Sequence, residues 1–415
     1  MKHLLQLLTT VLIMMSVVAC NNRPRVVAPF NYVSNRDSLK TYVDKAALTN
    51  DPKDQFCAAE YYLRQYTSTD SIKAIELLLK SASQNFPWAA NCLGNIYSKD
   101  STNSYYDIKK AVEYYELGAN NGADRAMTNL ANLYINGEGV KPDYKKAMQL
   151  RTDAILGLLE LAQKGDASAQ QRLGVNLADG IGVPENEKAG YEWIKKSADQ
   201  GYTPAQYGMG ICYQYGYGGV KKDTKEAFEY YLKAANKGDE AALYRIAQCY
   251  KDGIGVENDL SKAFEYYLRT AELGNIDAMF EVALCYQNGY GTTTNHKEAF
   301  KWYKKCAERG NLNAYNNIGA MYSEGEGVTQ DDKEAFRWFM KAAEAGNAFS
   351  QRVVGDFYYD GKGVEKDKTK AFEWYMKAAK EGDKIGMNRV ARCYLLGEGV
   401  VKDDKLVTFW FDKSK

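Results

Sequence analysis

The stretch DGIGVENDLSKAFEYYLRTAELGN, residues 252–275, joins a glycine-rich turn to an amphipathic segment, and it decides the fold because the chain repeats it. Close copies are EGEGVTQDDKEAFRWFMKAAEAGN at 324–347 and DGKGVEKDKTKAFEWYMKAAKEGD at 360–383. Self-similarity at this interval is typical of an array in which one small supersecondary unit stacks on the next. The 415-residue chain is therefore predicted to be a long repeat array rather than a set of unrelated domains.

Each copy contains a helix with a recognisable start. An acidic or amide side chain stands four residues before an alanine at the beginning of each amphipathic run, or before a valine in the last one. Such a side-chain oxygen accepts from the free N–H groups of a helix's first turn, and a glutamate three positions later, such as Glu226, is typical of a capping box. The predicted starts are Asp70, Asp107, Asp143, Glu185, Asp223, Asp259, Asn295, Asp331, Asp367 and Asp403.

A second type of helix precedes each of these starts. It carries small residues five positions apart, as at Ala205 and Gly210, and ends at a Gly-x-Gly pair such as Gly253 and Gly255. Glycine adopts positive φ without steric penalty, so these pairs are predicted to end one helix and turn the chain into the next. A phosphate-binding loop would instead follow a strand, and we therefore reject nucleotide binding for these glycines.

With units of about 36 residues that carry Leu-Gly, Tyr, Gly-x-Gly-Val, Asp, Lys-Ala, Trp-Tyr, Lys-Ala-Ala and Gly in this order, the chain resembles the Sel1-like repeat family from about residue 51 to residue 415. That family is related to the tetratricopeptide repeats. The resemblance implies an all-α fold, an α/α superhelix or solenoid of about ten helix-turn-helix repeats. The first two units, which lack the Gly-x-Gly pair, depart from the pattern.

The repeats and the two ends of the chain give a domain plan. One unit is longer than the others, because Ala147 and Ala162 are seven residues further apart than Ala227 and Ala235. Seven residues are close to two helical turns, so we expect a longer second helix whose packing face does not rotate. The plan comprises a lipoprotein signal peptide (1–19), a lipidated cysteine with a flexible tether (20–50), degenerate N-terminal repeats (51–125), the repeat array (126–403) and a C-terminal capping helix (404–415).

The first 20 residues predict where the protein is found. A basic start is followed by an apolar run over residues 4–18 and then by Val-Val-Ala-Cys at 17–20. This ending resembles the bacterial lipobox, in which the cysteine becomes the lipidated N-terminus; the alternative is an ordinary signal peptide with a chance cysteine. We therefore expect lipidation at Cys20 and a membrane-anchored lipoprotein of the bacterial cell envelope, at the outer membrane or facing the periplasm.

Charge and motifs narrow the range of functions. Without residues 1–19 the chain has 53 basic and 53 acidic side chains, a balance that is not built to hold nucleic acid or anionic lipid by charge. The remaining histidine, His296, stands at a helix start, and no Gly-x-Ser-x-Gly, Ser-x-x-Lys or zinc-ligand spacing is present in the sequence. We predict no enzymatic activity, no cofactor, no metal and no nucleic-acid partner.

The cysteines after Cys20 are predicted to be core residues. Cys212, Cys249, Cys285 and Cys393 occupy one repeat position, which Leu133, Met321 or Phe357 fills in other repeats. Equivalent helices of neighbouring repeats lie too far apart for a disulfide, so these thiols should stay reduced. Some cysteine-rich relatives in the family, which carry a cysteine pair in each repeat, are described as binding or slowly cleaving β-lactams. This chain departs from that pattern, with only Cys306 near the expected partner helix.

The first helix of each repeat offers a binding surface. If its leading small residue is buried, the second and sixth residues after it face the inner side, which in tetratricopeptide-like arrays receives a peptide. Three consecutive repeats carry an aromatic residue at the second position, with amide or charged residues on either side. The candidate partner-binding residues are Tyr207, Ile211, Tyr244, Phe280, Leu284, Asn316 and Arg352.

Two interpretations of the aromatic residues stay open. They form either a docking strip with a polar rim or a ladder of rings that only stack on one another. The preferred function is a non-catalytic protein–protein interaction scaffold, anchored by lipid, that binds a protein or peptide partner. The alternative is a protein that binds peptidoglycan, β-lactam or polysaccharide, or a weak hydrolase.

Overall fold

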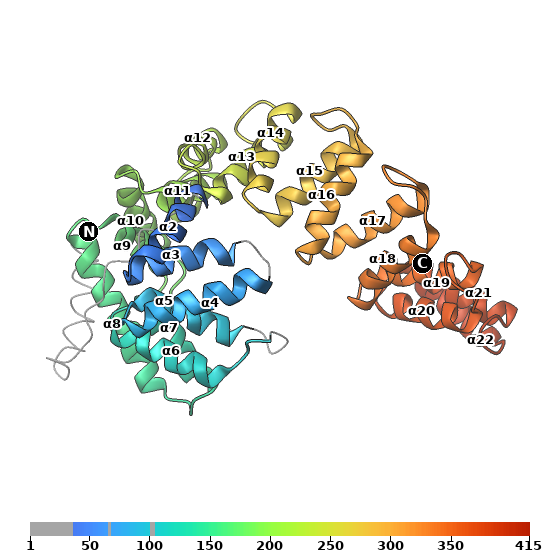
Figure 1. Cartoon of the computed structure of the whole chain (residues 1–415), viewed down its shortest axis with the longest axis horizontal. Coiled ribbons are helices and arrows are strands. Elements are labelled where there is room, and N and C mark those ends of the chain that lie inside the picture. Colours follow the sequence, from blue (N-terminus) through green and yellow to red (C-terminus); the bar gives the residue numbers. More distant parts are fainter. Residues whose placement is uncertain (1–35, 65–67, 100–103) are drawn as a thin grey trace. The chain divides into compact units, whose positions relative to one another are not determined.

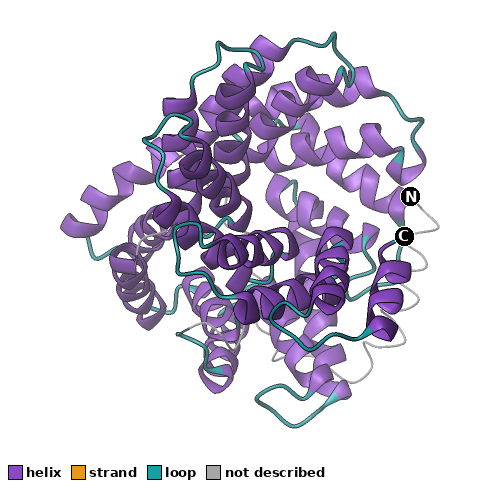
Figure 2. Cartoon of the chain, turned by 90° about the vertical axis from the view of Figure 1, so that its right-hand side faces the viewer, coloured by secondary structure: helices purple, strands orange, loops and turns teal. Residues whose placement is uncertain are grey.

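The computed structural model describes residues 36–64, 68–99 and 104–415, and every regular element within these ranges is helical (Figures 1 and 2). The earlier helices are α2 (Arg36–Leu48), α3 (Pro52–Leu63), α4 (Ser68–Ser83), α5 (Pro87–Ser98), α6 (Ile108–Asn120), α7 (Asp124–Asn136), α8 (Tyr144–Gln163), α9 (Ala167–Ala178), α10 (Glu187–Asp199), α11 (Thr203–Tyr215), the 3₁₀ turn η1 (Tyr217–Gly219), α12 (Thr224–Ala235) and α13 (Glu240–Asp252). The later ones are α14 (Leu260–Glu272), α15 (Ile276–Asn288), α16 (His296–Glu308), α17 (Leu312–Glu324), α18 (Asp332–Glu344), α19 (Ala348–Asp360), α20 (Lys368–Lys380), α21 (Lys384–Leu396) and α22 (Asp404–Ser414).

From α3 onward the helices form successive pairs, in which an odd-numbered helix is followed by an even-numbered one (Figure 1). The two helices of a pair pack together, as α9 does with α10, and the second helix also packs on the next pair, as α10 does on α11. This arrangement buries a continuous core between neighbours, which no single pair could do alone. The prediction of an all-α solenoid of helix-turn-helix repeats is confirmed.

The chain divides into two compact units. The first contains the described residues up to Cys249 together with Ile254–Glu257, and the second contains Tyr250–Gly253 and Asn258–Lys415. In the first unit one apolar core extends from Leu39 to Ala154, and further clusters continue it through Leu173 and Met209. In the second unit, clusters around Phe339 and Tyr375 play the same part.

Helix starts are fixed by the predicted side chains. Eight of the predicted residues, from Asp107 to Asp403, are N-caps; the Asp223 carboxylate, for example, accepts from the N–H groups of Lys225 and Glu226 at 3.0 and 3.1 Å. The N–H of the cap itself donates to the carbonyl of Tyr213 in the preceding helix, at 2.9 Å. A backbone acceptor thus takes the place that the capping box assigns to a glutamate side chain. The same bond recurs from Asp259 to Tyr250, Asn295 to Tyr286, Asp331 to Tyr322 and Asp367 to Tyr358.

Two predicted starts are wrong. The cap of α10 is Asn186 rather than Glu185, because the Asn186 amide oxygen reaches the N–H of Ala189 at 3.0 Å. Helix α4 begins at Ser68, so Asp70 lies within its first turn, where a carboxylate is favoured by the helix dipole.

The Gly-x-Gly pairs have two separate tasks. Gly289 ends α15 in the left-handed conformation, with φ 75°. Gly291, with φ 70°, lies so close to the preceding pair that a Cβ atom there would be 1.9 Å from the Leu260 carbonyl oxygen. The first glycine therefore ends a helix, and the second permits one repeat to approach the backbone of the repeat before it.

The two ends of the array differ in how well they were predicted. Helix α2 packs against α3 and buries Leu39 to 2 % exposure, so the predicted tether over 20–50 is too long. The gain from burying Leu39 favours order there over a free linker. The signal peptide, Cys20 and the tether up to residue 35 lie outside the described residues. The C-terminal helix α22 occupies most of the predicted capping segment.

The long repeat is confirmed, since α8 has 20 residues where α10 and α14 have 13. Its buried residues, which run from Ala147 through Ala154, Ile155 and Leu158 to Ala162, keep to one face over the whole length. The two added turns thus preserve the packing face, as predicted. No helix in the described ranges combines the length and apolarity needed to cross a bilayer.

Candidate functional site

In the first unit, the candidate residues Tyr207 and Ile211 lie on α11 and Tyr244 lies on α13, all partly exposed. The Tyr207 ring packs on Tyr231 of α12, with centroids 5.5 Å apart and planes at 45°. Tyr231 is fully buried, and its hydroxyl donates to Gln214 Oε1 at 2.6 Å. The partly exposed ring of Tyr207 is thus supported by a tyrosine whose ring is buried and whose hydroxyl is hydrogen-bonded.

In the second unit the same arrangement is found at Phe280. This ring, together with Leu284 on α15, is partly exposed, and it packs on Tyr303 of α16 with centroids 5.6 Å apart. Tyr303 is fully buried and donates to Gln287 Oε1 at 2.7 Å. The ring contacts of Tyr207 and Phe280 therefore run across their own helix pairs, onto the even-numbered helices.

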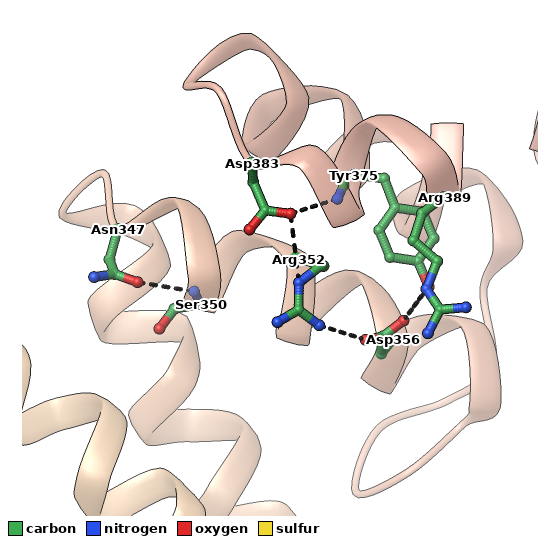
Figure 3. Close-up of polar contacts among 8 residues, drawn as sticks. Asn347, Ser350, Arg352, Asp356, Tyr375, Asp383 and Arg389 are labelled. Atoms are coloured by element: carbon green, nitrogen blue, oxygen red, sulfur yellow. Dashed lines mark hydrogen bonds and ion pairs between the residues drawn. The ribbon is translucent and has the colours of Figure 1, made fainter. Parts of the chain in front are cut away.

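The polar candidates Asn316 and Arg352 are held by their neighbours in the second unit. Asn316 Oδ1, on α17, accepts a hydrogen bond from the Ser350 hydroxyl. Arg352, on α19, lies 3.4 Å from Asp356 Oδ2 and 3.5 Å from Asp383 Oδ1 (Figure 3). Two carboxylates thus balance the Arg352 charge, and its side chain is only 13 % exposed.

Asp356 connects three helices of the second unit. Asp356 also receives a hydrogen bond from the Tyr375 hydroxyl at 2.8 Å and an ion pair from Arg389 at 3.1 Å (Figure 3). Asp383 caps α21 by accepting from the Gly386 N–H. The network ties α19, α20 and α21 together and gives this face a polar character without a large net charge.

The structure thus places Tyr207, Ile211 and Tyr244 in the first unit and the other four candidates in the second. Within each unit they occupy equivalent positions on the odd-numbered helices. The docking role of these residues stays a prediction.

The histidine and most of the cysteines in the described part of the chain are paired or buried within the repeats. His296, at the start of α16, faces Glu326 with 3.4 Å between Nδ1 and Oε2. The seven cysteines of the described residues are all free, and the four that share one repeat position are buried, as predicted. Burial raises the pKa of Cys212 and of Cys393 to about 11, which keeps both thiols protonated and weakly nucleophilic at neutral pH. Within the described ranges, no three or more His, Cys, Asp or Glu side chains are grouped to hold a metal ion.

A cavity of about 380 Å³ opens in the first unit between α5, α7 and α9. Its polar lining consists mainly of five amide side chains and two arginines, namely Asn91, Asn95, Asn129, Gln171, Asn176, Arg125 and Arg172. The second position after the leading small residue, which is predicted to face the inner side, holds Asn91, Thr128 and Gln171 in these repeats. Sequence reasoning gave Gln171 a role in orienting a ligand beside the aromatic residues but predicted no cavity here. The available signal was the recurrence of short polar residues at one position in three consecutive repeats.

The cavity is built on a buried ion pair. Arg172 of α9 bonds to Asp124, the first residue of α7, and its guanidinium lies 5.8 Å from the centre of the Trp88 ring. The Asp124 side chain is 1 % exposed. Burial raises the pKa of the Asp124 carboxyl, and the Arg172 charge opposes that rise.

Comparison with known proteins agrees with this architecture. A family model described as Sel1 repeat matches ten segments, at 57–86, 93–122, 124–150, 167–202, 203–239, 240–275, 276–311, 312–347, 348–383 and 385–414. The solved structure of c5321, a protective antigen present in uropathogenic Escherichia coli strains displaying an SLR fold, is similar with 30 % identity and a TM-score of 0.56. That match covers 92 % of this chain and 79 % of c5321.

Two further relatives are similar over shorter stretches. The chain is 30 % identical over 184 residues to chitin synthase regulatory factor 3 of Schizosaccharomyces pombe, which covers 35 % of this chain but only 20 % of that protein. It is 27 % identical over 173 residues to the Sel1-repeat-containing protein YjcO of Escherichia coli K12, which covers 41 % of this chain and 72 % of YjcO. The chain thus spans a fifth of the length of the yeast relative.

Proposed function

The chain belongs to the Sel1 repeat family, and on that premise we propose that it is a non-catalytic scaffold that binds another protein through the inner-side residues of its odd-numbered helices. Sel1 repeat proteins are in general protein-interaction scaffolds. The proposal adds the surface, the lack of catalysis and the location to that general role.

The observation that carries the proposal is the support under the exposed aromatic rings. Tyr207 rests on Tyr231 and Phe280 rests on Tyr303, and each supporting tyrosine is buried and hydrogen-bonded. Rings fixed in this way lose little conformational freedom when a partner covers them. Tyrosine is also one of the residue types that are enriched among those that dominate binding energy at protein interfaces.

Asn316 and Arg352 are proposed to form the polar surroundings of the aromatic residues. Because Asp356 and Asp383 already balance Arg352, we assign Arg352 to a polar rim rather than to an ionic anchor. Asn316, whose Oδ1 accepts from Ser350, keeps its amide N–H groups for a partner. The second unit would therefore recognise an apolar side chain at Phe280 and neutral polar groups beside it.

We propose further that the protein is anchored in the bacterial cell envelope by lipid at Cys20. The support is the lipobox-like sequence at 17–20, which follows a basic start and an apolar run. Metabolic labelling with a fatty acid tests the anchor. Label on the wild-type chain but not on Cys20→Ala is expected, and equal label on both would contradict the proposal.

Affinity capture from envelope extract tests the binding surface. The wild-type chain is compared with a variant in which Tyr207, Tyr244 and Phe280 are all replaced by Ser, and with Tyr290→Ser, which changes an exposed tyrosine in the turn after α15. A protein held in stoichiometric amount by wild type and Tyr290→Ser, but lost by the triple variant, is expected. Recovery of glycan fragments instead of a protein would favour the polysaccharide-binding alternative.

A further inference from the structure

Three asparagines that line the cavity between α5, α7 and α9 are joined to one another by hydrogen bonds. Asn129 Nδ2 donates to Asn91 Oδ1 and to Asn95 Oδ1, both at 3.1 Å, and the Tyr115 hydroxyl donates to Asn95 Oδ1 at 2.8 Å. Asn91 Oδ1 thus accepts one hydrogen bond and Asn95 Oδ1 accepts two, which fills both lone pairs of Asn95 Oδ1. Both amides have N–H groups that donate to no other group in the described part of the chain, and these are available to a ligand.

The charge of the cavity is positive. Its lining includes Arg125 and Arg172 but no aspartate or glutamate. Arg172 is neutralised by the buried Asp124, whereas exposed Arg125 has no carboxylate within 4.0 Å among the described residues. One uncompensated guanidinium thus remains at the cavity.

The cavity floor is already held in place before any ligand arrives. Asp124 and the Trp88 ring fix the Arg172 guanidinium from two sides. Two atoms in this buried pair, Asp124 Oδ1 and Arg172 Nε, have no hydrogen-bond partner in the structure. Both atoms are buried and Asp124 does not line the cavity, so neither atom is open to a ligand and the pair acts as support beneath the cavity.

We propose that this cavity binds a carboxylate of an extended peptide, with Arg125 as the ionic partner and the N–H groups of Asn91 and Asn95 as neutral donors. A single uncompensated positive charge suits a singly charged carboxylate, and a guanidinium binds one with charge-assisted hydrogen bonds. Val175 and Ile181 complete the lining with apolar surface for the carbon atoms next to the carboxylate. The volume of about 380 Å³ lies within the ordinary range of ligand pockets.

This inference rests on the proposed scaffold function, since the ligand is part of a protein. It adds a second binding site, in the first unit, with a chemistry different from that of the aromatic residues. The carboxylate belongs either to the C-terminus of the partner or to an acidic side chain, and the test distinguishes these two sources.

The test titrates the full chain by calorimetry with three acetylated pentapeptides of Ala and Val. One has a free C-terminal carboxylate, one has a C-terminal amide, and one has the amide and a central Glu. We expect at least one carboxylate peptide to bind about tenfold or more tightly than the neutral amide, as expected for a charged hydrogen bond. The carboxylate peptide that binds more tightly identifies the source.

Variants connect this binding to the cavity. Arg125→Gln should weaken the carboxylate peptide by about tenfold and leave the neutral amide unchanged. Arg337→Gln is the matched control, because it removes a guanidinium that is 71 % exposed on α18, in the other unit, and it should have no effect. Gln171→Leu provides a second cavity variant, and a melting curve of each variant checks that the fold is retained.

Three results would overturn the inference. They are equal binding of all three peptides, binding of none of them, and unchanged affinity of the carboxylate peptide for Arg125→Gln. If protein capture through Tyr207, Tyr244 and Phe280 persists in any of these cases, the scaffold function stands and only the carboxylate site fails. Loss of that capture with carboxylate binding intact would overturn the aromatic surface and leave the cavity supported.

Discussion

Gly291 lies against the Leu260 carbonyl oxygen so closely that the space between them would not hold a Cβ atom, which would come within 1.9 Å of that oxygen. The contact joins the turn after α15 to the first turn of α14, and it recurs between Gly363 and Asp332 at 2.1 Å. The spacing of the repeats thus requires glycine, which has no Cβ, at these positions. A helix pair meets its predecessor through backbone as well as through the apolar core.

Gly291→Ala should therefore destabilise the chain more than the same change at a glycine that has positive φ but no close neighbour. The matched control is Gly310→Ala, since Gly310 has φ 85° and nothing within 4 Å of the added Cβ. We expect about 1 kcal/mol from the left-handed conformation in both variants, and a further ~1–3 kcal/mol at Gly291 from overpacking. Urea denaturation measures both losses, and equal losses would show that the approach to Leu260 is not limiting.

The local signals explain why so much of the fold was predictable. Caps such as Asp223 and turn glycines such as Gly253 act within a few residues, so their spacing in the sequence predicts where helices start and end. The error at Glu185 has the same origin, because two adjacent residues each offer an acceptor and only the backbone path selects Asn186. Helix α2 was missed because its order depends on burying Leu39 in a core that lies elsewhere in the sequence.

The sites were less predictable than the fold. Helical periodicity predicts that Tyr207 and Phe280 lie outside the core, but it does not predict the tyrosines that support them, because those contacts join two helices. The Asp124–Arg172 pair joins residues that are 48 positions apart, and Arg352 is balanced in part by Asp383, the N-cap of α21 in the next helix pair. Only the folded chain shows which arginines keep an uncompensated charge, and that difference decides which of them can bind a ligand.

Arg172→Met should cost more stability at pH 7 than at pH 4. The variant leaves a buried carboxylate without its counter-charge, and breaking a buried pair in this way typically costs ~3–5 kcal/mol. Burial already raises the pKa of Asp124 in the folded chain, and loss of Arg172 removes the opposing effect. A raised carboxyl pKa means that the folded state holds the proton more tightly than the unfolded state, so stability falls as pH rises above the unfolded value of about 3.9.

Urea denaturation of wild type and variant at the two pH values measures this difference. Arg337→Met serves as control, because its exposed pair with Glu334 should contribute less than about 1 kcal/mol at either pH. A loss for Arg172→Met that is the same at pH 4 and pH 7 would mean that Asp124 does not titrate with the pair.

The buried thiols should resist alkylation in the folded chain. Burial raises the pKa of Cys212, Cys285 and Cys393 to about 11, so at pH 8 the thiolate fraction is very small, and access is blocked as well. Iodoacetamide at pH 8 should therefore modify these three residues rapidly only after urea unfolds the chain. Mass spectrometry of the peptides gives the extent at each site, and fast modification of Cys212 without urea would contradict its placement in the core.

Tyr207→Ser and Tyr231→Ala should separate binding from support. Tyr207 is partly exposed, and its loss removes one aromatic pair, which contributes about 0.5–1.5 kcal/mol. Tyr231 is fully buried, donates to Gln214 and packs against Gly210, where an added Cβ would lie 2.4 Å from its ring. Truncation of a buried aromatic residue of this kind costs ~3–5 kcal/mol.

The docking and the packing interpretations of the aromatic residues predict different results for these two variants. If Tyr207 is a docking residue, Tyr207→Ser keeps most of the stability but loses partner capture. If the rings of Tyr207 and Phe280 only pack the repeats, Tyr207→Ser should lose nearly as much stability as Tyr231→Ala. The molecules of this variant that remain folded should then still capture the partner. Tyr231→Phe adds a third measurement, since it keeps the supporting ring and removes only the bond to Gln214, so that capture should survive it. A loss of several kcal/mol for Tyr207→Ser, measured by urea denaturation, would refute the docking interpretation at this residue, because a ring that a partner can reach has less burial to lose.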